Sequence, residues 1–196
     1  GIFPLSPTLD TPGPLARNVK DTKLIFDTYN GSTLNQKPIK LDNMIFGKLK
    51  EPFTSNLDPE VEEAYEIVCS KLVKLGAKIK ELVIPEANEK ATLFPSIVGS
   101  EIVSAFGKDR FIKNVDKMDP VTGNRAKLGL NVSSFEYIEA INRHLELKDI
   151  TSRYFSKYDA LISPTTVMQA LEVDKSTIGG ELHDRSLLAS ANTQPV

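Results

Sequence analysis

Hydrophobic residues recur at helical spacing in several stretches of the chain. Asp58-Pro59 is typical of a helix start, and Gly76 follows the last position of an apolar stripe. A shorter helix is predicted to begin after Asn18, its N-cap, and to end at Gly31, its C-terminal stop. Ser133 and Glu136 form a capping box for a long helix over about residues 134–155. Its predicted core face carries Tyr137, Ile138, Ile141, Leu145 and Ile150.

Short apolar or alternating runs predict strands over residues 44–49, 77–84 and 158–165. The first two flank the helix that begins at Pro59, and such a β-α-β unit packs as parallel strands with a right-handed crossover. The pattern therefore predicts an α/β fold, with a mixed sheet flanked by helices.

The remaining stretches give weaker signals. Residues 90–106 are apolar at helical spacing, and we expect Pro95 to lie in the first turn. Residues 107–131 are mixed, with Asp119-Pro120 and Thr122-Gly123 as turn signals. We expect residues 166–196 to be mostly loop, with a short helix near residues 184–192.

The first 17 residues are rich in proline. Pro4, Pro7, Pro12 and Pro14 are incompatible with a regular helix, while several apolar side chains would anchor the segment as an ordered loop. Two interpretations remain open. In the first, the loop is a tight structural corner in which Asp10 or Thr11 forms a hydrogen bond with the backbone. In the second, the loop lines a functional site.

Composition excludes several classes of protein. Among 196 residues, 24 Lys and Arg stand against 26 Asp and Glu, and this balance argues against nucleic-acid binding. No apolar run approaches the roughly 18 residues that span a bilayer, so no membrane partner is expected. The single cysteine, Cys69, excludes an internal disulfide framework and favours a reducing, cytoplasmic compartment.

Few residues suggest chemistry by themselves. His144 falls on the polar part of the long helix and His183 in a loop, so no metal site is expected from them. Cys69 lies within a helical stripe and is interpreted as a buried small hydrophobe. The sequence contains no Gly-x-Ser-x-Gly elbow and no phosphate-binding loop, and no glycine-rich turn follows Leu49, which argues against a dinucleotide site.

Residues 3–21, which read FPLSPTLDTPGPLARNVKD, resemble the segment that follows the catalytic core in amidase signature enzymes. Later pieces keep the order of that family: residues 45–47, 76–85, 135–143 and 158–165, then the start of a closing motif at residues 192–196. The resemblance implies that residues 1–196 are the C-terminal portion of a single amidase domain, incomplete at both ends. A start at Gly1 and an end at Val196 fit this expectation.

The family's Gly/Ser-rich signature and its lysine base lie upstream of this segment, and neither pattern occurs here. The resemblance thus implies a parent enzyme that hydrolyses an amide C–N bond by serine acyl-enzyme chemistry, with no catalytic residue in this chain and no metal or organic cofactor. Its implied partners are a small-molecule amide substrate and the missing catalytic portion of the same enzyme, with a homodimer as a further option.

The resemblance also implies three substrate-binding residues. Asp10 and Thr11 lie in the loop that adjoins the catalytic core in the family. Arg125, four residues before Gly129, resembles an arginine with which glutamine-directed relatives hold a substrate carboxylate, and a guanidinium fork suits that task. The alternative for Arg125 is a solvated surface arginine. Alternatives for the whole chain are a catalytically inactive remnant or binding fragment, and a protein like the amidase-type subunit of an amidotransferase.

Overall fold

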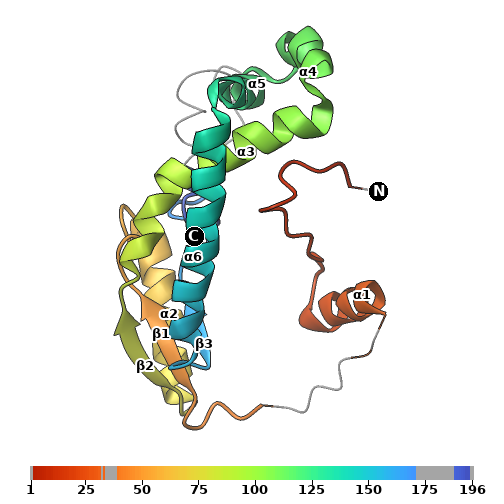
Figure 1. The fold of residues 1–196 in the computed structure, drawn as a ribbon. Helices are drawn as coiled ribbons and strands as arrows, with labels where there is room; N and C mark the ends of the chain where they lie inside the picture. The colour runs from red at the N-terminus through yellow and green to blue at the C-terminus, as the bar shows by residue number, and fades with distance from the viewer. Residues whose placement is uncertain (1, 32, 34–38, 171–187, 195–196) are drawn as a thin grey trace.

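A small three-stranded parallel sheet lies at the lower left of Figure 1. The computed structural model describes residues 2–31, 33, 39–170 and 188–194. Strand β1 (Ile45–Leu49) lies at the centre, between β2 (Lys78–Leu82) and β3 (Ala160–Ile162), and both pairings are parallel. Gly47 lies opposite Lys80 on one side and Leu161 on the other. The predicted α/β class is confirmed, and the strands of the described residues are all parallel.

Helices cover the two faces of this sheet. Helix α2 (Pro59–Lys74) connects β1 to β2, which confirms the predicted β-α-β unit, and it lies behind the sheet in Figure 1. Its Tyr65 hydroxyl donates to the Leu49 and Ile162 carbonyls at 3.1 and 2.7 Å. Helix α6 (Ser134–Phe155) crosses the front, where Tyr154 packs on the sheet cluster. That cluster consists of Leu49, Phe53, Leu82, Ile84, Ala87 and Leu161.

The segment between β2 and α6 is almost entirely helical. It comprises α3 (Lys90–Phe106), α4 (Lys108–Asn114), α5 (Pro120–Lys127) and three short 3₁₀ turns, η1 (Pro85–Glu89), η2 (Val115–Lys117) and η3 (Leu128–Asn131). A second core cluster joins α3, α4 and α5; it contains Ile102, Val103, Phe111, Val115 and Ala126.

Two predictions in this segment were wrong. Pro95 lies inside α3, beyond its first turn. Thr122 and Gly123 lie within α5, because Asp119 acts as the N-cap, accepting the Thr122 N–H at 3.0 Å, and Pro120 fits the first helical position. The Asp-Pro pair therefore starts a helix here instead of a turn.

The capping box of α6 is confirmed, since Ser133 and Glu136 bond each other's backbone N–H groups. The predicted core face is wrong in part. Ile138 and Leu145 are 55% and 54% exposed, while Tyr137, Ile141 and Ile150 are half-buried. The buried side chains of α6 are those of Ala140, His144 and Leu147. Helix α3 packs along α6, and its position selects the buried stripe. The expected surface placement of His144 is consequently wrong as well.

Helix α1 (Val19–Asn30) has the predicted caps, with Asn18 accepting the Asp21 N–H at 2.9 Å and Gly31 in the left-handed region at φ 62°. It buries none of its residues, and it stands apart from the helices and sheet in Figure 1. Val19, Leu24 and Tyr29 are 85%, 67% and 68% exposed. The helix therefore presents apolar side chains to solvent.

The C-terminal part is only partly described. A helix is predicted near residues 184–192, and residues 188–189 are helical. Residues 184–187 lie outside the described residues, as does His183. Within the described residues, no helix combines the length and the apolar character needed to cross a membrane.

Candidate functional site

The N-terminal loop is bonded to α3 through one buried carboxylate, that of Glu101. One oxygen, Oε2, accepts the Ser6 hydroxyl at 2.5 Å and the Thr8 backbone N–H at 3.0 Å. The other, Oε1, accepts the Thr8 hydroxyl and, at 2.8 Å, the phenol of Tyr137 on α6. Glu101 thus joins the loop, α3 and α6 at a single point.

The loop continues from this point into a closed turn. The Ser6 carbonyl accepts the N–H groups of Leu9 and Asp10 at 3.0 and 2.7 Å. The Asp10 carboxylate in turn accepts the Leu5 N–H at 2.9 Å. Asp10 therefore bonds the backbone of its own corner, as one interpretation of the sequence allowed, while Asp10 and the following Thr11 remain exposed.

The four donors keep the Glu101 carboxylate charged in a buried position. Burial raises the pKa of Glu101, but the hydrogen bonds from Ser6, Thr8 and Tyr137 together lower it by more, and the net shift is downward. Burial and the bond to Glu101 raise the pKa of Tyr137. Sequence reasoning missed Glu101. The available signal was that it is the sole charged residue between positions 91 and 107, because a lone acid in an apolar helix needs partners.

Arg125 lies on α5, half-buried, and its guanidinium has no ion pair or hydrogen bond with any described residue. Its neighbour Ala126 is buried against Ile102 and Val103 of α3. The ring of Phe106, at the end of α3, packs on that same cluster and lies 4.8 Å from the ring of Phe3 in the N-terminal loop. The loop and Arg125 are therefore attached to one helix, although no hydrogen bond or ion pair in the described structure joins Arg125 to the corner.

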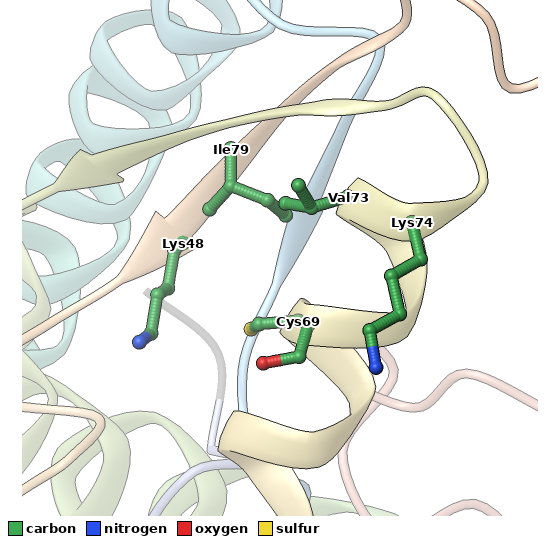
Figure 2. Close-up of a pocket in the computed structure, with 6 residues that line it drawn as sticks. Lys48, Cys69, Val73, Lys74 and Ile79 are labelled. Carbon is green, nitrogen blue, oxygen red and sulfur yellow. The ribbon is translucent and has the colours of Figure 1, made fainter.

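A cavity of about 370 Å³ lies between α2 and the sheet. Figure 2 shows Lys48 from β1, Ile79 from β2 and Cys69 from α2 around it. The Lys48 ammonium is 2.5 Å from Oε1 of Glu66 and 5.5 Å from the centre of the Tyr65 ring. Burial raises the pKa of the Cys69 thiol, and the predicted burial of Cys69 is confirmed. A paired lysine and a protonated thiol offer no activated nucleophile here.

A second hollow, of about 440 Å³, runs along α2 and the end of β3. Val61, Ala64 and Val68 line it on the helix side, and residues 161–166 line the other side. Among the described residues, no group of three or more His, Cys, Asp or Glu side chains could hold a metal ion.

Comparison with known proteins agrees with the resemblance noted in the sequence. The Amidase family model matches residues 1–196. The chain belongs to the amidase family. It is 29% identical to 2-amino-5-chloromuconic acid deaminase from Comamonas testosteroni over an alignment of 170 residues that covers 84% of this chain and 37% of that protein. It is 27% identical to one of the subunits of glutamyl-tRNA(Gln) amidotransferase from Salinispora tropica, with 90% and 45% of the two chains covered.

A solved amidase structure shares the fold, with a TM-score of 0.80 at 19% identity, over 97% of this chain and 44% of the other. At the level of the family, membership indicates amide hydrolysis. The chain spans less than half the length of each of these three relatives.

Asn192 begins the stretch that resembles the family's closing motif, and its side chain is bonded within this fold. The side-chain amide of Asn192 donates to the Phe53 carbonyl at 2.8 Å and to the Pro164 carbonyl at 3.0 Å. Phe53 follows β1 and Pro164 follows β3, so Asn192 links the segments beyond the carboxyl ends of two neighbouring strands. Residues 195–196 of the motif lie outside the described residues.

Proposed function

We propose that residues 1–196 form the C-terminal part of a single amidase domain, and that the complete enzyme hydrolyses a carboxylic amide by serine acyl-enzyme chemistry. The nucleophilic serine, the bridging cis-serine and the lysine base belong to the part of the enzyme outside this chain. The observation that carries the proposal is the family match along the whole chain, combined with a span of less than half of the relatives.

In that chemistry, the neutral lysine takes the proton of the nucleophilic serine through the bridging serine. The serine oxygen attacks the amide carbonyl, and backbone N–H groups stabilise the oxyanion. The amine or ammonia leaves with a proton, and water then hydrolyses the acyl-enzyme to the carboxylic acid. This chain contributes the substrate side: the corner that carries Asp10 and Thr11, and Arg125 as the group that binds a substrate carboxylate.

The reading frame around this chain supplies the test. The 196-residue chain and the protein translated from the extended frame are each incubated with primary amides, and ammonia release is measured. We expect release from the longer protein and none from the 196-residue chain. Ammonia release by the pure 196-residue chain that disappears when one of its serines is replaced would refute the assignment of catalysis to another segment.

Arg125 offers a test of substrate class within the longer protein. A half-buried guanidinium without an acidic partner in the described residues can bind a carboxylate through two parallel hydrogen bonds. We expect Arg125→Lys to raise KM for amides that bear a carboxylate, by about tenfold or more, and to leave KM for uncharged amides unchanged. Lys127→Ala is the matched control, because Lys127 on the same helix pairs with Asp116 at 2.8 Å. Equal effects of both variants would mean that Arg125 is a solvated surface residue.

An amidotransferase function is the second candidate, and the similarity to the glutamyl-tRNA(Gln) amidotransferase protein favours it. In that case the longer protein co-purifies with a partner protein, and the ammonia released by the amidase site passes to an acceptor. Isolation of the longer protein without a partner, with full hydrolysis of free amides, favours the hydrolase. A longer protein that lacks the Gly/Ser-rich signature is an inactive remnant or a binding protein.

We further propose that the partners of the chain are a small-molecule amide and the catalytic portion of the enzyme. The exposed apolar side chains of α1 suit a packing surface for that portion; a homodimer is the alternative. The near-zero net charge supports the absence of a nucleic-acid partner, and the single cysteine supports a cytoplasmic location.

A further inference from the structure

Both oxygens of the buried Glu101 carboxylate are occupied by hydrogen-bond donors from other parts of the chain. Its two oxygens receive four hydrogen bonds, three of which come from Ser6 and Thr8 of the N-terminal loop. Ser6 and Glu101 are 1% and 8% exposed, although the segment around Ser6 is mostly exposed. The loop is thus fastened to the body of the protein at one polar point.

We propose that Glu101 is a positioning residue, which holds the loop so that Asp10 and Thr11 face the substrate. The connection runs through Ser6, whose hydroxyl donates to Glu101 and whose carbonyl accepts the Asp10 N–H at 2.7 Å. The Asp10 carboxylate closes the corner on the Leu5 N–H. Release of Ser6 from Glu101 therefore loosens the whole corner. The loop attachment stands on this geometry alone, and its effect on catalysis rests on the proposed function.

The arrangement suits a carboxylate. Both oxygens of Glu101 act only as acceptors, and each faces two donors. Glu101→Gln keeps the shape of the side chain but removes its charge, and it replaces one acceptor oxygen by an NH₂ group. The hydroxyls around that group would have to turn from donating to accepting, and the Thr8 backbone N–H can only donate, so the hydrogen bonds to the loop weaken. Glu101→Asp retains the charge and both acceptor oxygens, but its side chain is one methylene shorter. The oxygens therefore lie farther from the donors of the loop.

Hydrogen–deuterium exchange on the 196-residue chain tests the attachment. The N–H groups of Leu5, Thr8, Leu9 and Asp10 report on the corner, because each is hydrogen-bonded within it or to Glu101. We expect Glu101→Gln to accelerate their exchange by about tenfold or more, and exchange in α3 and α6 to stay as in the wild type. Ser6→Ala removes the hydroxyl that donates to Glu101, so it should also accelerate exchange in the loop. This variant keeps the test available if Glu101→Gln fails to fold.

Glu89→Gln is the matched control, because Glu89 also bonds α6, through Arg143 at 2.6 and 2.7 Å, but forms no hydrogen bond or ion pair with the N-terminal loop among the described residues. Unchanged loop exchange in both Glu101→Gln and Ser6→Ala overturns the proposal. Parallel acceleration of the loop and of α3 and α6 also overturns it, since Glu101 would then serve the fold in general.

Kinetics of the longer protein test the positioning role. We expect Glu101→Gln to lower kcat by about tenfold or more with a smaller change in KM, since misplacement of about 1 Å has large effects on rate. Glu101→Asp should recover part of kcat. Fast exchange in the loop with an unchanged kcat would refute the positioning role, while the attachment of the loop by Glu101 would stand. A wild-type longer protein without amidase activity refutes the proposed function, and the exchange result still decides the attachment.

Discussion

Gly99 of α3 and Gly129 of η3 bring their backbones into direct contact. A Cβ atom added to Gly99 would lie 2.9 Å from the Gly129 Cα, closer than side chains tolerate, and a Cβ added to Gly129 would overlap the Gly99 carbonyl. Both residues are buried, at the contact between α3 and η3. Because η3 continues directly from α5, this approach fixes where Arg125 stands relative to α3.

We expect Gly129→Ala to destabilise the protein by about 1–3 kcal/mol or more, because the added methyl group meets backbone atoms that cannot rotate away. Gly13→Ala is the control, since a Cβ there meets nothing within 4 Å and its φ is not positive. Urea unfolding of the two variants measures the difference. Equal stability would show that α3 and η3 do not pack at this distance.

The buried stripe of α6 can be tested with two leucines. Leu147 is fully buried, at 0% exposure, whereas Leu145 is 54% exposed. Leu147→Ala should cost about 2–5 kcal/mol, because it removes buried methyl groups and leaves a cavity. Leu145→Ala should cost well under about 1 kcal/mol. Thermal or urea unfolding of both variants distinguishes this arrangement from the predicted core face, which would reverse the order.

These elements show where sequence reasoning succeeds. Helix starts such as Asn18 and Ser133 and the β-α-β unit follow from local chemistry and spacing, and the structure has them. The buried face of α6 depends on where α3 lies, and apolar spacing alone does not contain that information. Glu101 was missed for the same reason. Its donors lie far away in the sequence, 95, 93 and 36 positions from it, at Ser6, Thr8 and Tyr137.

His144 should make the protein less stable below about pH 6.5, the ordinary pKa of histidine. Burial lowers the pKa of His144, Lys148 lowers it further, and Glu101 partly opposes both. As the pH falls, the unfolded state therefore takes up a proton before the folded state does. Stability decreases from the ordinary pKa of histidine down to the lowered pKa of His144 in the folded protein. Unfolding free energies between about pH 8 and pH 5 measure the slope.

His144→Gln isolates this effect, because it removes the titrating group and leaves the carboxyl groups and His183 in place. We expect the wild type to lose up to about 1.4 kcal/mol per pH unit more than the variant in this window. Parallel stability curves for the two proteins would mean that His144 titrates equally in the folded and unfolded states, contrary to its burial.

Cys69 should react slowly with thiol reagents in the folded protein. Its side chain is 5% exposed, and burial raises the pKa of the thiol, so that both access and thiolate are scarce near about pH 8. We expect reaction with a disulfide reagent such as DTNB to be at least about tenfold slower in native buffer than in denaturing urea. Because the chain has one cysteine, the Cys69→Ser variant gives the background directly. A native rate equal to the unfolded rate would show that α2 opens from the sheet faster than the reagent attacks, and that the cavity beside Lys48 is accessible from solvent.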